Sequence, residues 1–79
     1  MKIEILGTGC AKCKALEEAT KQAVAQSGLF VQIEKIEDIQ KIMEYHVMST
    51  PGLVIDGKVL STGKLLSVNE IVEMIKANQ

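Results

Sequence analysis

The chain has 79 residues, 47% of them hydrophobic, which is enough for a single domain (residues 1–79) with a core of its own. Its 9 basic residues are all lysines and its formal net charge is −1, so it lacks the arginine-containing basic surface typical of nucleic-acid binding. No apolar run reaches membrane-spanning length and no signal-peptide pattern opens the chain, so we expect a cytoplasmic monomer with neither nucleic-acid nor membrane partners.

Hydrophobic periodicity divides the chain into four strands and three helices. Short runs in which isoleucine, valine or leucine alternate with polar residues predict the strands, and longer runs of helix-forming residues predict the helices. The predicted elements, in chain order, are a strand at 2–6, a helix at 11–26, a strand at 30–35, a helix at 37–45, strands at 53–55 and 58–60, and a final helix that follows Ser67.

Glycines and capping residues mark where these elements begin and end. Gly28 closes the first helix as a C-cap. The pair Asp56-Gly57 predicts a two-residue hairpin turn between the last two strands. Ser67 and Glu70 have the spacing of a capping box at the start of the final helix, which is therefore the best marked element of the chain.

Apolar residues at helical spacing predict the face that each helix buries. These residues are Leu16, Ala19, Ala23 and Val24 in the first helix, Ile39, Ile42 and Met43 in the second, and Val68, Ile71, Val72 and Ile75 in the third.

The order β-α-β-α-β-β-α indicates an α/β fold with a four-stranded mixed sheet. The first two strands are expected to be parallel, because a right-handed helical crossover joins them. The last two strands form an antiparallel hairpin. We expect the first and third helices to cover one face of the sheet and the second helix to cover the other.

Cys10 and Cys13 are the only cysteines, and they form a Cys-x-x-Cys motif where the first helix begins. Unpaired N–H groups and the helix dipole favour a thiolate there, so Cys10 is the predicted nucleophile and the more shielded Cys13 the resolving thiol. Their spacing allows a disulfide to close with a small adjustment. A bridge this short stabilises a fold by only about 2 kcal/mol, so we interpret the pair as a reversible redox switch.

A second motif, Thr50-Pro51-Gly52, opens the third strand. With the Cys-x-x-Cys motif, the hairpin and the final helix, it gives a chain that resembles the thioredoxin fold in its minimal form over essentially its whole length. The closest resemblance is to the small thioredoxin-like redox-active disulfide proteins of prokaryotes, which are similar in size to glutaredoxins. It implies a thiol–disulfide oxidoreductase that carries electrons on its own dithiol, without a cofactor or a bound metal.

The resemblance also implies how the site is arranged. The Thr50–Pro51 peptide bond would be cis and would lie beside the two sulfurs. Gly9, Thr50 and Pro51 would form the groove against which an extended partner peptide lies. The implied partners are disulfide-containing proteins and a reductase that regenerates the dithiol.

Three features depart from larger members of that family. The first strand offers only Ile3, Ile5 and Leu6 for burial, so we expect no buried carboxylate beneath the cysteines. The loop after the fourth strand lacks the Gly-Gly-x-Asp pattern with which glutaredoxins hold glutathione. His46 stands where relatives often have glycine, and we interpret it as a left-handed helix-end residue, neither a base nor a metal ligand.

Two other functions stay open. The segment from Gly7 to Cys13 is similar to the loop of small ferredoxin-like metal carriers, which bind soft ions such as Cu(I) through two thiolates. Those domains end in a strand, whereas this chain ends in a capped helix. A thioredoxin-like adaptor with little turnover is the third possibility. Lys12 and Lys14 either add positive charge near Cys10 or form an ordinary solvated helix face.

Overall fold

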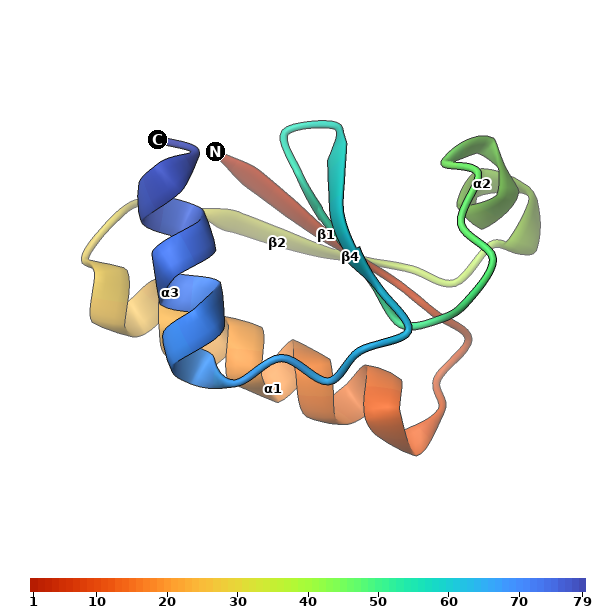
Figure 1. The fold of residues 1–79 in the computed structure, drawn as a ribbon, viewed down its shortest axis with the longest axis horizontal. Helices are drawn as coiled ribbons and strands as arrows, with labels where there is room; N and C mark the ends of the chain where they lie inside the picture. The colour runs from red at the N-terminus through yellow and green to blue at the C-terminus, as the bar shows by residue number, and fades with distance from the viewer.

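The computed structural model describes all of residues 1–79, and its elements follow one another in the predicted order (Figure 1). Their bounds are β1 (Lys2–Leu6), α1 (Ala11–Ser27), β2 (Gln32–Ile36), α2 (Ile39–Glu44), β3 (Gly52–Ile55), β4 (Lys58–Thr62) and α3 (Val68–Ala77). None of the three helices is both long enough and apolar enough to cross a lipid bilayer.

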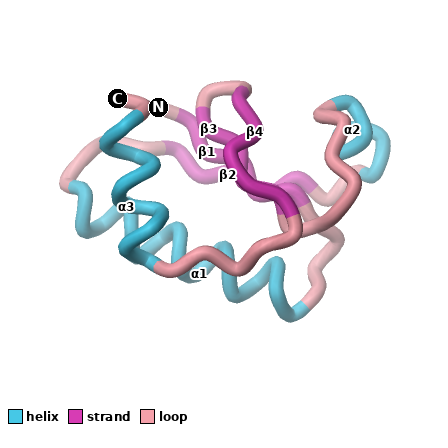
Figure 2. Tube along the Cα trace, in the orientation of Figure 1, coloured by secondary structure: helices cyan, strands magenta, loops and turns pink.

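The four strands, magenta in Figure 2, form one mixed sheet. Their order across the sheet is β2-β1-β3-β4. β1 lies in the interior, parallel to β2 and antiparallel to β3. β3 and β4 form the predicted hairpin, whose turn residues Asp56 and Gly57 have φ angles of 48° and 84°. The predicted α/β architecture is confirmed, and the two outer strands of the sheet, β2 and β4, are short.

Side chains that alternate along the strands divide the core between the two faces of the sheet. α1 and α3 cross on one face (Figure 1), and α2 packs on the other. The core on the α1 and α3 side consists of Ile3, Ile5, Leu16, Ala23, Leu53, Ile55, Leu66, Ile71 and Ile75. The smaller core on the α2 side consists of Leu6, Ile36, Ile42 and Val54. The predicted placement of the helices is therefore confirmed.

The second strand begins two residues later than predicted, at Gln32 instead of residue 30. Gly28 ends α1 with a φ of 70°, and the next two residues complete the turn toward β1. Pairing with the first strand begins only where the N–H of Gln32 donates to the carbonyl of Met1. Phe30 therefore lies outside the sheet, with 97% of its surface exposed.

The second helix is shorter than predicted because Asp38 caps it, accepting a hydrogen bond from the N–H of Gln40. The prediction that Ile39 and Met43 face inward is wrong, since they are 62% and 65% exposed. α2 lies beyond the centre of the sheet, toward the end where the cysteines are (Figure 1). A helix of six residues in that position buries only Ile42.

The last strand continues to Thr62, two residues past its predicted end. Thr62 pairs with Gly52, and an irregularity between Leu53 and Val54 shifts the register within the hairpin. That shift interrupts the alternation of polar and apolar residues, which explains why the pattern in the sequence ends early.

Candidate active site

The two cysteines lie at the N-terminus of α1, one exposed and one buried. Cys10 is the N-cap residue, and its sulfur accepts a hydrogen bond of 3.2 Å from the backbone N–H of Cys13. Cys13 lies one turn further along the helix and is only 3% exposed. Both are free thiols.

This geometry shifts the pKa values of the two thiols in opposite directions. Hydrogen bonds from the thiol and then from the backbone N–H of Cys13 lower the pKa of Cys10. Burial raises the pKa of the Cys13 thiol, and so does its hydrogen bond to Cys10. Of the two thiols, the one that solvent can reach therefore ionises more readily, which is the order that thiolate attack requires.

The sulfur of Cys13 packs directly against Gly7. A Cβ at Gly7 would overlap this sulfur and would lie 3.1 Å from the Cβ of Cys13. Gly7 is buried, and its N–H donates to the carbonyl of Ile36 in β2. Gly7 was not among the predicted site residues, so this supporting role was missed. The usable signal is a glycine at the end of a strand and three residues before Cys10, since such a glycine can mark the close approach of another group.

Gly9 precedes the exposed cysteine and has a φ of 86°, in the region that favours glycine. A Cβ at this position would lie 3.5 Å from the Oε2 atom of Glu37, so this carboxylate is a close neighbour of the loop that carries Cys10. Glu37 was not among the predicted site residues. It follows β2 directly, and only the parallel pairing of β1 and β2 brings it to this loop.

Thr50 and Pro51 lie at the same edge of the sheet as the cysteine loop. Gly52 pairs with Leu6, so the next position of this antiparallel ladder places Pro51 opposite Gly7. Pro51 is buried and Thr50 is exposed. The peptide bond between them is cis.

Gly63, directly after β4, connects this segment to α1. Its N–H donates to the carbonyl of Pro51 at 2.8 Å, and its own carbonyl accepts a hydrogen bond of 3.4 Å from the Nζ atom of Lys12. The Lys12 side chain therefore reaches across the edge of the sheet instead of extending freely into solvent. The five predicted site residues Cys10, Cys13, Gly9, Thr50 and Pro51 thus lie along one edge of the sheet, and the roles assigned to them stay predictions.

The other polar features of the molecule lie apart from the sulfurs. Thr20 is the one buried polar residue, so no carboxylate lies beneath the cysteines. No group of three or more His, Cys, Asp or Glu side chains gathers where it could hold a metal ion. His46 has a φ of 59° at the end of α2, as predicted, and its N–H donates to the carbonyl of Met43.

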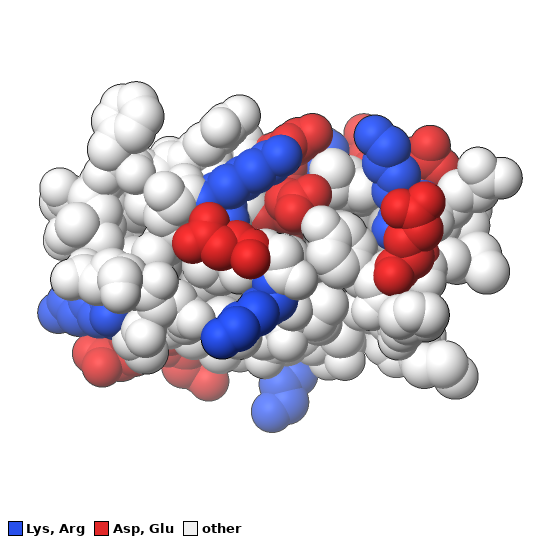
Figure 3. All heavy atoms as spheres, turned by 90° about the horizontal axis from the view of Figure 1, so that it is seen from above, with Lys and Arg blue, Asp and Glu red and all other residues white.

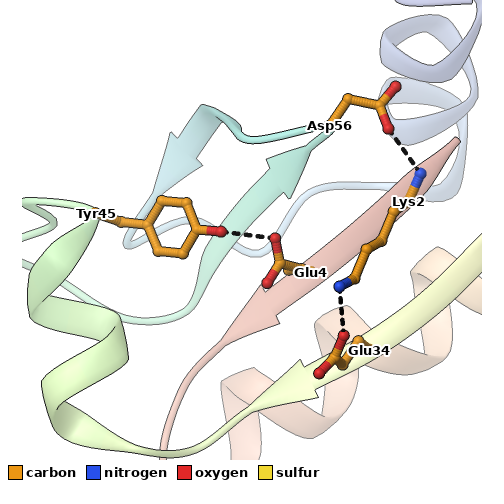
Figure 4. A network of polar contacts seen from close by, with 5 residues as sticks. All are labelled: Lys2, Glu4, Glu34, Tyr45 and Asp56. Atoms are coloured by element: carbon orange, nitrogen blue, oxygen red, sulfur yellow. Dashed lines mark hydrogen bonds and ion pairs between the residues drawn. The ribbon is translucent and has the colours of Figure 1, made fainter.

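A polar cluster occupies the face of the sheet beside α2 (Figure 4). The hydroxyl of Tyr45 donates to Glu4 at 2.7 Å, and the ammonium of Lys2 lies 2.8 Å from Glu34. These residues line a hollow of about 340 Å³. Neither cysteine contributes to its wall, so we attribute the cluster to the fold and not to thiol chemistry.

Comparison with known proteins agrees with this geometry. The family profile of the thioredoxin domain matches residues 1–76. The chain belongs to the thioredoxin domain family. A protein named thioredoxin from Methanothermobacter thermautotrophicus is 39% identical over 75 residues, which cover 95% of this chain and 97% of that protein. A second thioredoxin, from Methanocaldococcus jannaschii, is 41% identical over 75 residues, covering 95% of this chain and 86% of that protein.

Proposed function

We propose that this member of the thioredoxin family is a thiol–disulfide oxidoreductase that reduces disulfide-containing proteins. The observation that carries the proposal is the pairing of an exposed Cys10 of lowered pKa with a buried Cys13 of raised pKa, one helical turn apart. The family membership and the names of both relatives support the same chemistry.

In the proposed reaction, the thiolate of Cys10 attacks one sulfur of the substrate disulfide. A mixed disulfide forms, and the other substrate sulfur leaves as a thiolate that takes up a proton. Cys13 then loses its proton and attacks the sulfur of Cys10, which releases the second substrate thiol. The protein dithiol is oxidised by two electrons and the substrate disulfide is reduced by two, so a separate dithiol reductase must regenerate the protein.

Substrate binding is assigned to the edge of the sheet around Cys10. Thr50 is exposed beside the buried Pro51, and Gly9 leaves space next to the attacking sulfur because it carries no side chain. We propose that an extended segment of the substrate lies along these three residues. We also propose that the protein acts as a cytoplasmic monomer.

Equilibration of the protein against a series of dithiothreitol ratios tests the redox proposal. A single two-electron transition is expected, with two free thiols at the reduced end and none at the oxidised end. Thiols that stay reduced in the folded protein under mild oxidant would contradict the proposal. Tight binding of one Cu(I) or Zn²⁺ ion by such a protein would favour a metal carrier instead.

Two variants test the roles of the cysteines. Cys10→Ser should abolish the reduction of insulin disulfides, because the attacking sulfur is gone. Cys13→Ser should accumulate a mixed disulfide with the substrate, detectable as a mass increase that dithiothreitol reverses. Ser49→Ala, an exposed change near the same edge of the sheet, is the matched control and should leave both results unchanged.

A further inference from the structure

The edge of the sheet that carries Cys10 has different charges on its two sides. Strands β1, β2 and β4 run in one direction and β3 runs in the opposite direction. Therefore β1, β2 and β4 end at this edge, and β3 begins there. Across the sheet, the residues at this edge are therefore Glu37 after β2, Gly9 and Cys10 after β1, Thr50 before β3, and Gly63 after β4.

The β2 side of this edge is acidic. The Oε2 atom of Glu37 lies 3.5 Å from where a Cβ of Gly9 would be, so its charge is next to the residue that precedes Cys10. Glu37 is exposed and has no hydrogen bond or ion pair of its own. The carboxylate of Asp38 lies nearby, but it already accepts a hydrogen bond from the N–H of Gln40. Glu37 is therefore the free anion on this side.

The β4 side is basic. The Lys12 ammonium reaches the carbonyl of Gly63 at 3.4 Å, which holds this cation over the end of β4 without neutralising it. Lys64 adds a second cation, although it is close enough to Glu70 to act on that carboxylate as well. Elsewhere the charges are mixed. On the side of the molecule away from α1, lysine and acidic side chains are interspersed, and no large patch carries charges of one sign only (Figure 3).

We propose that Glu37 and Lys12 are specificity determinants that select the charge order around the reactive cysteine of a partner. The preferred partner carries a basic side chain on one side of its disulfide cysteine, facing Glu37, and an acidic side chain on the other side, facing Lys12. The opposite order places like charges together on both sides. This inference rests on the proposed disulfide reduction, since it concerns the substrate of that same site.

The size of the effect follows from the exposure of both groups. An exposed ion pair contributes about 0.2–1 kcal/mol, which corresponds to roughly a 1.5- to fivefold change in rate for each pair. Two pairs that act together should separate the two charge orders by about two- to 25-fold at low ionic strength. At about 1 M salt the Debye length falls to about 3 Å, and the difference should largely vanish.

Two isomeric peptide disulfides test the proposal. One is the homodimer of acetyl-Lys-Ala-Cys-Ala-Glu-amide, and the other is the homodimer of acetyl-Glu-Ala-Cys-Ala-Lys-amide. Both have the same composition and zero net side-chain charge, so their rates differ only through charge order. Each is mixed in excess with the reduced protein, and the rate of dithiol loss is divided by the rate of the same peptide with dithiothreitol.

The wild type should prefer one isomer by about two- to 25-fold. Lys12→Gln and Glu37→Gln should each bring this ratio closer to one, and the double variant Lys12→Glu with Glu37→Lys should invert it. Lys58→Gln and Glu73→Gln remove the same charges from exposed sites on the hairpin and on α3, and they should leave the ratio unchanged.

Equal rates for the two isomers, or a preference that the double variant does not invert, would overturn the inference. Both results leave the proposed function intact if the uncharged disulfide of 2-mercaptoethanol is still reduced. Failure to reduce any of the three disulfides would instead contradict the proposed function itself.

Discussion

The sulfur of Cys13 occupies the space beside Gly7 where a side chain would otherwise begin. This contact packs the Cys13 thiol, in the first turn of α1, against the residue that directly follows β1. It explains why the buried thiol is held one turn below Cys10, where burial raises the pKa of Cys13, while hydrogen bonds from Cys13 lower the pKa of the exposed Cys10. Gly7, which carries no reactive group, thereby sets the position of one of the two cysteine sulfurs.

Gly7→Ala should displace Cys13 and destabilise the fold by about 1–3 kcal/mol, the usual cost of inserting a methyl group into a filled space. Urea denaturation measures the loss. A double-mutant cycle with Cys13→Ala is the control, because removal of the sulfur relieves the overlap and should reduce the cost of the alanine. Equal costs in both backgrounds would contradict the contact.

Cys10 should react with limiting iodoacetamide well before Cys13. It is exposed and its pKa is lowered, so its reaction should reach half-maximal rate below the free-thiol value of about pH 8.5. Mass spectrometry of the digested protein measures the labelled fraction at each cysteine. The urea-unfolded chain is the control and should lose most of the preference; equal labelling in the folded protein would argue against the assignment.

Ser67→Ala should lower the free energy of unfolding by about 1 kcal/mol, because α3 loses a capping box in which Ser67 and Glu70 bond reciprocally. For a domain of this size the melting temperature should fall by roughly 4–8 °C. Asn69→Ala, an exposed substitution in the same turn, is the control. A change no larger than that of the control would show that α3 is held by packing alone.

Stability should fall in acid through Glu34 and Glu70. The hydrogen bond and charge of Lys2 lower the pKa of Glu34, and the N–H of Ser67 lowers the pKa of Glu70. Because both folded values lie below the unfolded ones, the stabilisation is complete above the unfolded value and is lost as the pH falls through the folded value. Thermal melts from about pH 5 to pH 3 should show the loss.

Glu34→Gln and Glu70→Gln should each flatten this acid dependence. Glu73→Gln, which removes an exposed carboxylate of α3 that has no ion pair or hydrogen bond, is the control. An acid transition of the same steepness in all three variants would contradict the assignment to these two groups.

Tyr45→Phe should cost about 0.5–1.5 kcal/mol, because it removes the hydrogen bond that joins α2 to Glu4 of β1. Disulfide reduction by the folded variant should keep the wild-type rate, since the hydroxyl lies in the polar cluster on the sheet face (Figure 4) and not at the sulfurs. A large loss of activity with unchanged stability would contradict the separation of these two regions.

The sequence by itself determined the order of elements and the position of Cys10 and Cys13 at the start of the first helix. The signals were local: the alternation of isoleucine in β1, the Asp56-Gly57 turn and the capping box at Ser67. Such a signal can be read from the sequence where neighbouring residues favour the same backbone conformation. The same holds for the N-terminal position of Cys10 on α1, which follows from a glycine-rich break between a strand and a helix.

Tertiary structure alone decided which residues surround the sulfurs. Glu37 lies beside the cysteine loop, and Lys12 reaches Gly63, only because the order β2-β1-β3-β4 brings the ends of β2 and β4 to the two sides of this loop. The exposure of Ile39 and Met43 likewise depends on where α2 meets the sheet. Contacts between residues far apart in the chain depend on strand register and packing, and no local pattern encodes them.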